Sequence, residues 1–193
     1  MSNGVVHVGA HQGEEISQYL SDGRSPIICF EPQFQSDQAE GISWVNSAVG
    51  LWSGSMVLRI PHHIDSPTLD TMSASALPII PEAAVANGWT VTPVEKSTVP
   101  VVRFDEWAKN SGFVDGSCSL LVVDAQGTEM EVLRSFGSVL QGFSELVVEC
   151  SEPSLWSGQS TASEVIAFLG TQGFEPTTPI LRHGDIHFEK RSL

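Results

Sequence analysis

Residues 5–13 read VVHVGAHQG, an apolar run that ends in a glycine-rich turn. The run predicts a strand over Val5–Val8, and the apolar spacing in residues 14–21 predicts a helix directly after the turn. Such a turn lets a ligand approach the backbone at the helix N-terminus, although a tight connection without a ligand is the alternative. Gly9 and Gly13 are spaced Gly-x-x-x-Gly, so the Gly-x-Gly-x-x-Gly fingerprint of dinucleotide-binding proteins is absent.

Apolar runs and helix-period stretches alternate along most of the chain. This order predicts an α/β fold with a mostly parallel sheet and helices on its faces. The run LLVV at residues 120–123 is apolar at every position, as expected of a central strand buried on both faces. The further predicted strands are Ile27–Phe30, Trp44–Val45 and Glu145–Cys150, with Phe174–Ile180 and Asp185–Lys190 as a closing hairpin.

Capping signals predict where three of the helices begin. Asp105 is predicted to be the N-cap of a short helix. Thr128 with Glu131, and Thr161 with Glu164, have the spacing of capping boxes. Each signal fixes a helix start directly after a predicted strand or loop.

Residues 52–104 differ from the rest of the chain. Ser55–Ile60 alternates like an exposed strand, and Val91–Arg103 is interrupted by prolines in the manner of an edge strand. Residues 61–81 are rich in Pro, Ser and Thr and are typical of loop. We predict an antiparallel insertion within a single domain, 1–193, and expect it to contribute to the site for a second substrate.

Composition restricts the partners. The formal net charge is −14, from 23 acidic and 9 basic residues, so phosphate backbones and anionic lipid are repelled and we expect neither nucleic acid nor membrane as a partner. Neither a signal-peptide pattern nor an apolar stretch of about 20 residues is present. Cys29, Cys118 and Cys150 have no disulfide or zinc spacing and are expected to be buried thiols, which predicts a cytoplasmic protein.

Polar residues end two of the early strands. Glu31 follows the second strand, about 20 residues after the glycine-rich turn, where a carboxylate can accept hydrogen bonds from the hydroxyls of a ribose. An ordinary solvated carboxylate is the alternative. Asn46, Ser47 and Ala48 end the third strand, where polar groups would face the edge of an adenine, although such residues also end strands for turn reasons.

Two more acids end later strands. Asp124 follows the run 120–123, and Glu149 lies in the next predicted strand. If the two strands are neighbours, the acids converge. They would then offer carboxylates to Mg²⁺, although we favour the plainer account in which Glu149 pairs with a hydrogen-bond donor.

Taken in order, these motifs resemble the FkbM family of methyltransferases. The matching pieces run from residue 5 to residue 190 and are VGAHQG, FEP, NSAVG, RFDEW, VDAQGTE, LVVEC and DIHFEK. The resemblance implies a Rossmann-like class I methyltransferase sheet, mostly parallel with an antiparallel last strand. It also implies S-adenosylmethionine as methyl donor and a hydroxyl acceptor on a small molecule or sugar.

The resemblance also assigns roles by position. Gly9, His11 and Gly13 would line the methionine part of the donor, and Asp124 would lie near its amino group or the acceptor. His7 departs from the family pattern, which usually has an acid there. The full predicted donor-binding set is Gly9, Ala10, His11, Gly13, Glu31, Asn46, Ser47, Ala48 and Asp124.

A hydroxyl acceptor must lose a proton during methyl transfer, so the site needs a base. Asp124 and His11 are our first choices as catalytic residues. Trp89 and Trp156 are candidates to stack on the acceptor. The full set of candidate bases is His11, His62, His63, Asp124 and His183.

Two other functions stay open at this point. One is a non-catalytic domain that binds an adenosyl ligand, and the other is a nucleotide-dependent oxidoreductase. A homo-oligomer also stays open, because a second subunit would be one way to cover the acceptor.

Overall fold

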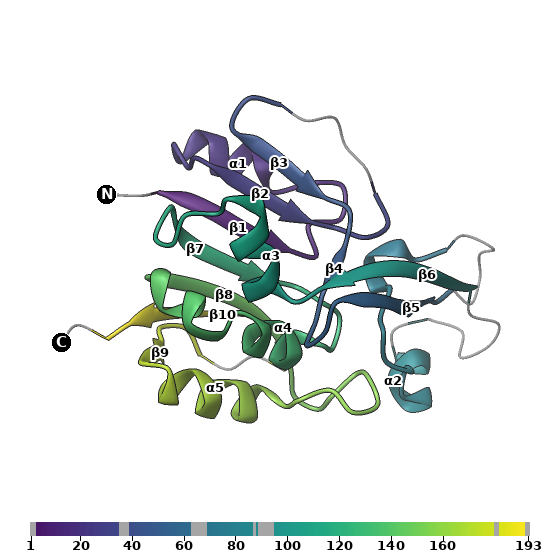
Figure 1. The fold of residues 1–193 in the computed structure, drawn as a ribbon. Coiled ribbons are helices and arrows are strands. Elements are labelled where there is room, and N and C mark those ends of the chain that lie inside the picture. Colours follow the sequence, from purple (N-terminus) through teal and green to yellow (C-terminus); the bar gives the residue numbers. More distant parts are fainter. Residues whose placement is uncertain are drawn as a thin grey trace.

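The computed structural model describes residues 3–34, 39–62, 69–86, 88, 95–179 and 182–191. Within these residues the main sheet has seven strands in the order β3-β2-β1-β7-β8-β10-β9 (Figure 1). All neighbouring pairs among β3, β2, β1, β7 and β8 are parallel, whereas β10 is antiparallel to both β8 and β9. The strands are β1 (Gly4–Val8), β2 (Ile27–Phe30), β3 (Ile42–Val45), β7 (Cys118–Val123), β8 (Glu145–Ser151), β9 (Phe174–Pro176) and β10 (His183–Lys190).

The mostly parallel sheet and its closing hairpin are therefore confirmed, although Ile180 lies outside the described residues. The helices are α1 (Ile16–Ser21), α2 (Pro81–Ala86), α3 (Phe104–Ser111), α4 (Glu129–Ser135) and α5 (Ala162–Thr171), with 3-10 turns η1 (Thr71–Ser73) and η2 (Gly137–Gly142). Among these described helices, none is long and apolar enough to span a membrane.

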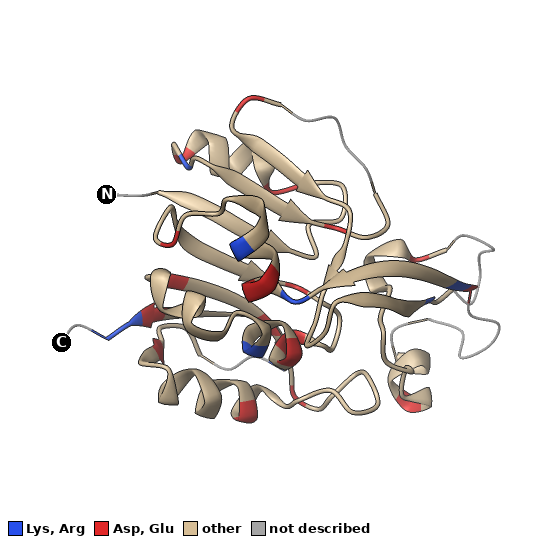
Figure 2. Cartoon of the chain, viewed as in Figure 1, with Lys and Arg blue, Asp and Glu red and all other residues tan. Residues whose placement is uncertain are grey.

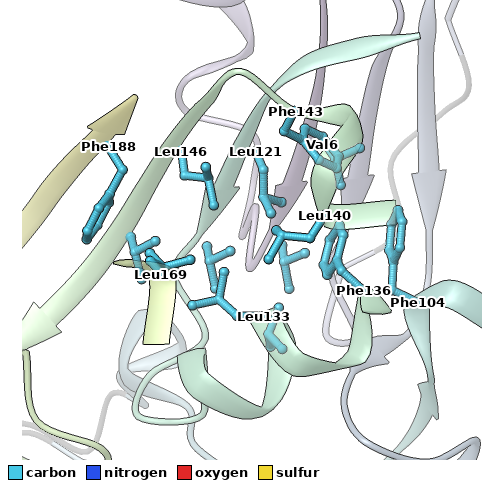
Figure 3. Close-up of a cluster of buried hydrophobic side chains, with 14 of the residues drawn as sticks. Val6, Phe104, Leu121, Leu133, Phe136, Leu140, Phe143, Leu146, Leu169 and Phe188 are labelled. Atoms are coloured by element: carbon cyan, nitrogen blue, oxygen red, sulfur yellow. The ribbon is translucent and has the colours of Figure 1, made fainter. Parts of the chain in front are cut away.

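Alternating side chains of β1 divide the core between the two faces of the sheet. Val5 packs with Tyr19 of α1 on one face. Val6 and Val8 point to the other face, which α3, α4, η2 and α5 cover. Figure 3 shows this larger core, where Phe104 and the other labelled side chains from the strands and helices interleave. Because β1 is buried on both faces, its side chains are apolar on both sides apart from His7.

The region 52–104 contributes two strands, β5 and β6, to a second, smaller sheet in the order β4-β6-β5. β5 (Gly54–Ile60) and β6 (Glu95–Val102) pair antiparallel, as the sequence predicts, and β4 (Ala48–Val49) pairs parallel to β6. Residues 91–94, predicted as edge strand, lie outside the described part. The short strand β4 directly follows β3, so the small sheet grows out of the carboxyl edge of the large one (Figure 1).

The prediction of Asp105 as an N-cap is wrong, whereas Thr128 is the N-cap residue of α4 as predicted but makes no capping box. Arg103 is the N-cap of α3, and Asp105 lies inside the helix, where its Oδ1 is 2.7 Å from Arg103 Nε. The Thr128 hydroxyl donates to the Ala125 carbonyl and makes no capping hydrogen bond. The start of α4 is instead held by a buried carboxylate, that of Glu129. Its Oε1 accepts the N–H groups of residues 125 and 127, which fixes the loop that leads into the helix.

Other expectations are confirmed. Thr161 and Glu164 form a complete capping box at the start of α5. Cys29, Cys118 and Cys150 are buried and free of disulfides.

Candidate active site

A pocket opens where the carboxyl ends of β1, β2 and β7 meet the small sheet. Val8, Phe30 and Asp124 mark the three strand ends, and Met56 and Leu58 of β5 form part of the opposite wall. The pocket contains about 850 Å³ of free space, a volume that includes its open mouth. Ligands of open parallel sheets bind at this edge.

Gly9 allows the ends of β1 and β7 to meet. Its φ of +85° lies in the left-handed region, and a Cβ added there would stand 1.7 Å from the Asp124 carbonyl oxygen. The Asp124 N–H donates to the Val8 carbonyl at 2.9 Å, which fixes this close approach. The glycine-rich turn and the first catalytic candidate are therefore backbone neighbours.

The Glu31 carboxylate faces the glycine-rich turn. Its Oε2 accepts the His11 N–H at 3.0 Å, and its Oε1 accepts the Gln33 N–H at 2.7 Å. Only 4% of Glu31 is exposed. Burial raises the pKa of Glu31, although the two backbone donors oppose that rise in part. The turn and this acid thus bound one pocket, the arrangement on which an adenosyl-binding site depends.

Both ring nitrogens of His11 have partners. Nδ1 lies 2.8 Å from Glu14 Oε1, and Nε2 lies 3.0 Å from Thr71 Oγ1. Partial burial acts to raise the pKa of Glu14, but its hydrogen bonds, that of His11 first, outweigh this, and the net shift is downward. His11 would have to release one partner before its ring could accept a proton from a substrate.

Asp124 and Glu149 converge, because β7 and β8 are neighbours. Gln126, at a φ of +47°, donates from Nε2 to Asp124 Oδ1 at 2.7 Å and to Glu149 Oε2 at 2.9 Å. Burial raises the pKa of Asp124, and burial together with the Asp124 charge raises the pKa of Glu149 well above its ordinary range. The two raised pKa values indicate that the pair retains one proton between its members, so the two acids titrate as a unit.

A model for the methyltransferase FkbM domain matches residues 7–176, which include every residue that lines the pocket. The chain belongs to the FkbM methyltransferase family. No curated protein and no solved structure gives a significant match.

The structure adds a third acid to the site of this FkbM domain. Glu129 is 3% exposed, and burial raises its pKa to about 7. The two backbone N–H groups that donate to its carboxylate act to lower this pKa, but burial outweighs them. Carboxylate oxygens of Asp124, Glu129 and Glu149 lie within 4.8 Å of one another, a spacing that would suit a metal ion. The Gln126 amide, however, points its donor at two of the three, where a cation would have to sit.

Sequence reasoning passed over Glu129 because it assigned the cap to the neighbouring threonine. A signal was present in VDAQGTE, where an acid stands in the first turn of the helix that follows the strand. Carboxylates are favoured at that end of a helix.

Three residues of the predicted donor set stand behind the pocket wall. Asn46 Nδ2 donates to the carbonyls of residues 31, 32 and 34 at 3.2–3.3 Å, so it braces the loop after β2. Gly13 packs on Trp44, because a Cβ there would approach that ring to 3.0 Å. Ser47 is nearly buried. The predicted residues that do line the pocket are Gly9, Ala10, His11, Glu31, Ala48 and Asp124.

The remaining candidates that the structure describes, His62, His183 and Trp156, do not line the pocket. His183 Nδ1 lies 2.8 Å from Ser151 Oγ, and its Nε2 is 3.5 Å from Glu149, so it stands behind the acid pair and not on the pocket. His62 bridges to Leu69 and is not a lining residue. Trp156 is 2% exposed and packs on Gly127, so the prediction that it stacks on an acceptor is wrong. His63 and Trp89 lie outside the described residues.

His7, the departure from the family pattern, belongs to the core. Its Nδ1 is 3.1 Å from the Tyr19 hydroxyl, and it points to the α1 face, away from the pocket. Burial lowers the pKa of His7 to about 4, so the ring is neutral near pH 7. A neutral, paired imidazole replaces the acid without adding charge to the core.

Proposed function

We propose that this FkbM domain transfers a methyl group from S-adenosylmethionine to a hydroxyl oxygen of a small molecule or sugar. The observation that carries the proposal is the contact between the His11 N–H and Glu31 Oε2, 3.0 Å across the base of the pocket. It brings the glycine-rich turn and the acid at the end of β2 to one site. The strand order, with one antiparallel strand near its edge, supports a Rossmann-like class I sheet.

Glu31 is the residue that we assign to the ribose. Both of its oxygens already accept one backbone N–H, and each keeps a lone pair for a ligand hydroxyl. The two backbone donors fix the orientation of the carboxylate before any ligand arrives. A fixed acceptor loses little freedom on binding, so its hydrogen bonds contribute more to affinity.

The charge of the pocket suits a cationic donor. The ionisable lining residues are His11 and four acids, Glu14, Glu15, Glu31 and Asp124, with no Lys or Arg among them. S-adenosylmethionine supplies a methyl group already activated by its positive sulfonium. An acidic pocket stabilises that charge and disfavours an acceptor that carries carboxylate or phosphate.

Asp124 is the base that we assign. S-adenosylmethionine, when bound, would supply the methyl group. Its sulfur–methyl bond would break as the acceptor oxygen bonds to the methyl carbon, S-adenosylhomocysteine would leave, and the hydroxyl proton would pass to the Asp124 carboxylate. Burial, which raises the pKa of Asp124, makes it a stronger base than an exposed aspartate. The Gln126 amide holds its Oδ1, and burial beside Asp124 raises the pKa of Glu149, which disfavours a second negative charge there.

Calorimetric titration tests the donor assignment. Wild-type protein should bind S-adenosylmethionine and not NAD, and Glu31→Gln should weaken donor binding at least about tenfold through loss of charge-assisted hydrogen bonds. Glu40→Gln is the matched control, because it removes one exposed acid that does not line the pocket. Equal affinity of the wild type and Glu31→Gln would overturn the ribose role.

Methyl transfer itself separates an enzyme from a binding domain. Hydroxylated acceptors supplied with isotope-labelled donor should gain label, and Asp124→Asn should reduce the rate by about 10²–10⁴ with donor binding retained. Donor binding without transfer to any acceptor would favour the non-catalytic alternative. We also place the protein in the cytoplasm, since its three buried thiols suit a reducing compartment.

A further inference from the structure

Besides the strands of the small sheet, residues 71–76 also reach the pocket, and we call them the bridging segment. Thr71, Met72, Ala74 and Ala76 of this segment line the pocket. The segment belongs to the region 52–104 and adjoins the glycine-rich turn and the loop that carries Glu31. It therefore supplies the wall that a second substrate would meet.

Thr71 contacts two of the strand-end loops. Its Oγ1 lies 3.0 Å from His11 Nε2, in the loop after β1. Its carbonyl accepts a hydrogen bond from Gln33 Nε2 at 3.0 Å, in the loop after β2. One residue of the insertion is thus bonded to both loops that bound the donor side of the pocket.

Ser75 contacts the third loop. This fully buried serine donates from Oγ to the Gln126 carbonyl at 2.5 Å, in the loop after β7. Its backbone N–H and carbonyl pair with Arg59 of β5 at 3.0 and 2.7 Å. The bridging segment is therefore fixed to the small sheet and to the loop that carries the catalytic candidate.

The contacts of Thr71 close a ring of four residues. His11 and Gln33, whose side chains contact Thr71, are the same residues whose backbone N–H groups donate to Glu31. Any displacement of Thr71 is transmitted through their side chains to the two donors that orient the carboxylate. The same contacts work in the opposite direction, so a ligand bound at Glu31 affects the position of the bridging segment.

We propose that Thr71 is a positioning residue that couples the donor site to the acceptor wall. Donor binding at Glu31 stabilises the ring, and the ring holds the bridging segment in place for the acceptor. Thr71 acts through His11 and Gln33 and does not touch reacting atoms. The inference rests on the proposed donor, S-adenosylmethionine. It adds an order of binding, in which the donor binds first and thereby fixes the wall that contacts the acceptor.

Calorimetry with S-adenosylhomocysteine tests the role of the hydroxyl. Thr71→Val removes Oγ1 and keeps the shape, so we expect about fivefold weaker binding, as for loss of one hydrogen bond. Thr71→Ser should restore the wild-type affinity. Thr98→Val, an exposed threonine of β6 outside the pocket, is the matched control and should bind as the wild type does.

Amide hydrogen exchange tests the coupling itself. Saturating S-adenosylhomocysteine should slow exchange across the bridging segment in the wild type, and this protection should be smaller in saturated Thr71→Val. Gln33→Met removes the other contact to Thr71 and should act in the same direction, which keeps the test valid if one variant fails to fold. A merely structural Thr71 would change thermal stability without changing ligand-induced protection.

The outcomes are distinct. Binding to the wild type without added protection of the bridging segment overturns the coupling and leaves the donor assignment intact. Unchanged affinity in both Thr71→Val and Gln33→Met overturns it as well. Absence of any binding to the wild type overturns the proposed function, and the coupling with it.

Discussion

At the scale of single residues, the acid pair Asp124 and Glu149 decides the charge of the site. A carboxyl group whose pKa is higher in the folded than in the unfolded chain binds extra protons in the folded state. Its contribution to stability is complete below the ordinary glutamate pKa of about 4.3 and is lost as the pH rises toward the raised value. The pair titrates as a unit, so the slope belongs to both acids.

Glu149→Gln should therefore flatten the dependence of stability on pH. The variant replaces the protonated acid by a neutral isostere, so the fall in unfolding temperature between about pH 5 and about pH 9 should be smaller than in the wild type. Glu152→Gln, at an exposed position nearby, should leave that fall unchanged. Thermal unfolding followed by circular dichroism across this range measures it. Parallel curves for wild type and Glu149→Gln would mean that Glu149 is ionised in the fold.

Gly9 offers a second test at this scale. Gly9→Ala combines a left-handed φ with a collision against the Asp124 carbonyl, and should cost at least about 2–3 kcal/mol of unfolding free energy. Gly23 has a similar φ of +69° but nothing within 4 Å of its added Cβ, so Gly23→Ala should cost only about 1 kcal/mol. Urea unfolding compares the two. Equal losses of unfolding free energy would show that the ends of β1 and β7 are less closely packed in solution than in this structure.

At the scale of elements, the sequence predicted the strands and helix caps that depend on residues close together in the chain. The strands next to β1 are apolar at nearly every position because both faces of the sheet are covered, and the capping box at Thr161 needs only residues three apart. The start of α4 and the inward turn of Asn46 depend instead on backbone groups brought in by folding. The contact between Thr71 and His11 joins positions 60 residues apart, which no local pattern reveals.

The two threonines at helix starts give a test of that distinction. Thr161→Ala removes a real cap and should lower the unfolding free energy by about 1 kcal/mol. Thr128→Ala removes only a bond to the Ala125 carbonyl and should cost clearly less, because Glu129 holds the start of α4. Chemical denaturation of both variants measures the difference. A larger loss of unfolding free energy for Thr128→Ala would indicate that the predicted capping box does form.

At the scale of the whole molecule, acidic charge dominates. Figure 2 shows many acidic residues, in loops and in the later helices and strands, and few basic ones, in keeping with the net charge of −14. The family and the mostly parallel sheet could be predicted from the order of short motifs. The small sheet's contacts with the pocket could not, because its loop sequence has no strong period.

This charge predicts electrostatic attraction of the donor. S-adenosylmethionine is a net cation near neutral pH, so its association rate should fall as salt rises from low ionic strength to about 0.15 M, where the screening length is about 8 Å. Stopped-flow binding at several salt concentrations measures the rate. A rate that rises or stays constant with salt would contradict attraction by the acidic pocket.

A crystal structure with S-adenosylhomocysteine tests the central claim most directly. The account predicts that both ribose hydroxyls lie within about 2.5–3.2 Å of the Glu31 carboxylate, with the sulfur on the side of the pocket where Asp124 stands. A ligand bound elsewhere, or a ribose that leaves Glu31 bonded only to the His11 and Gln33 N–H groups, would contradict it.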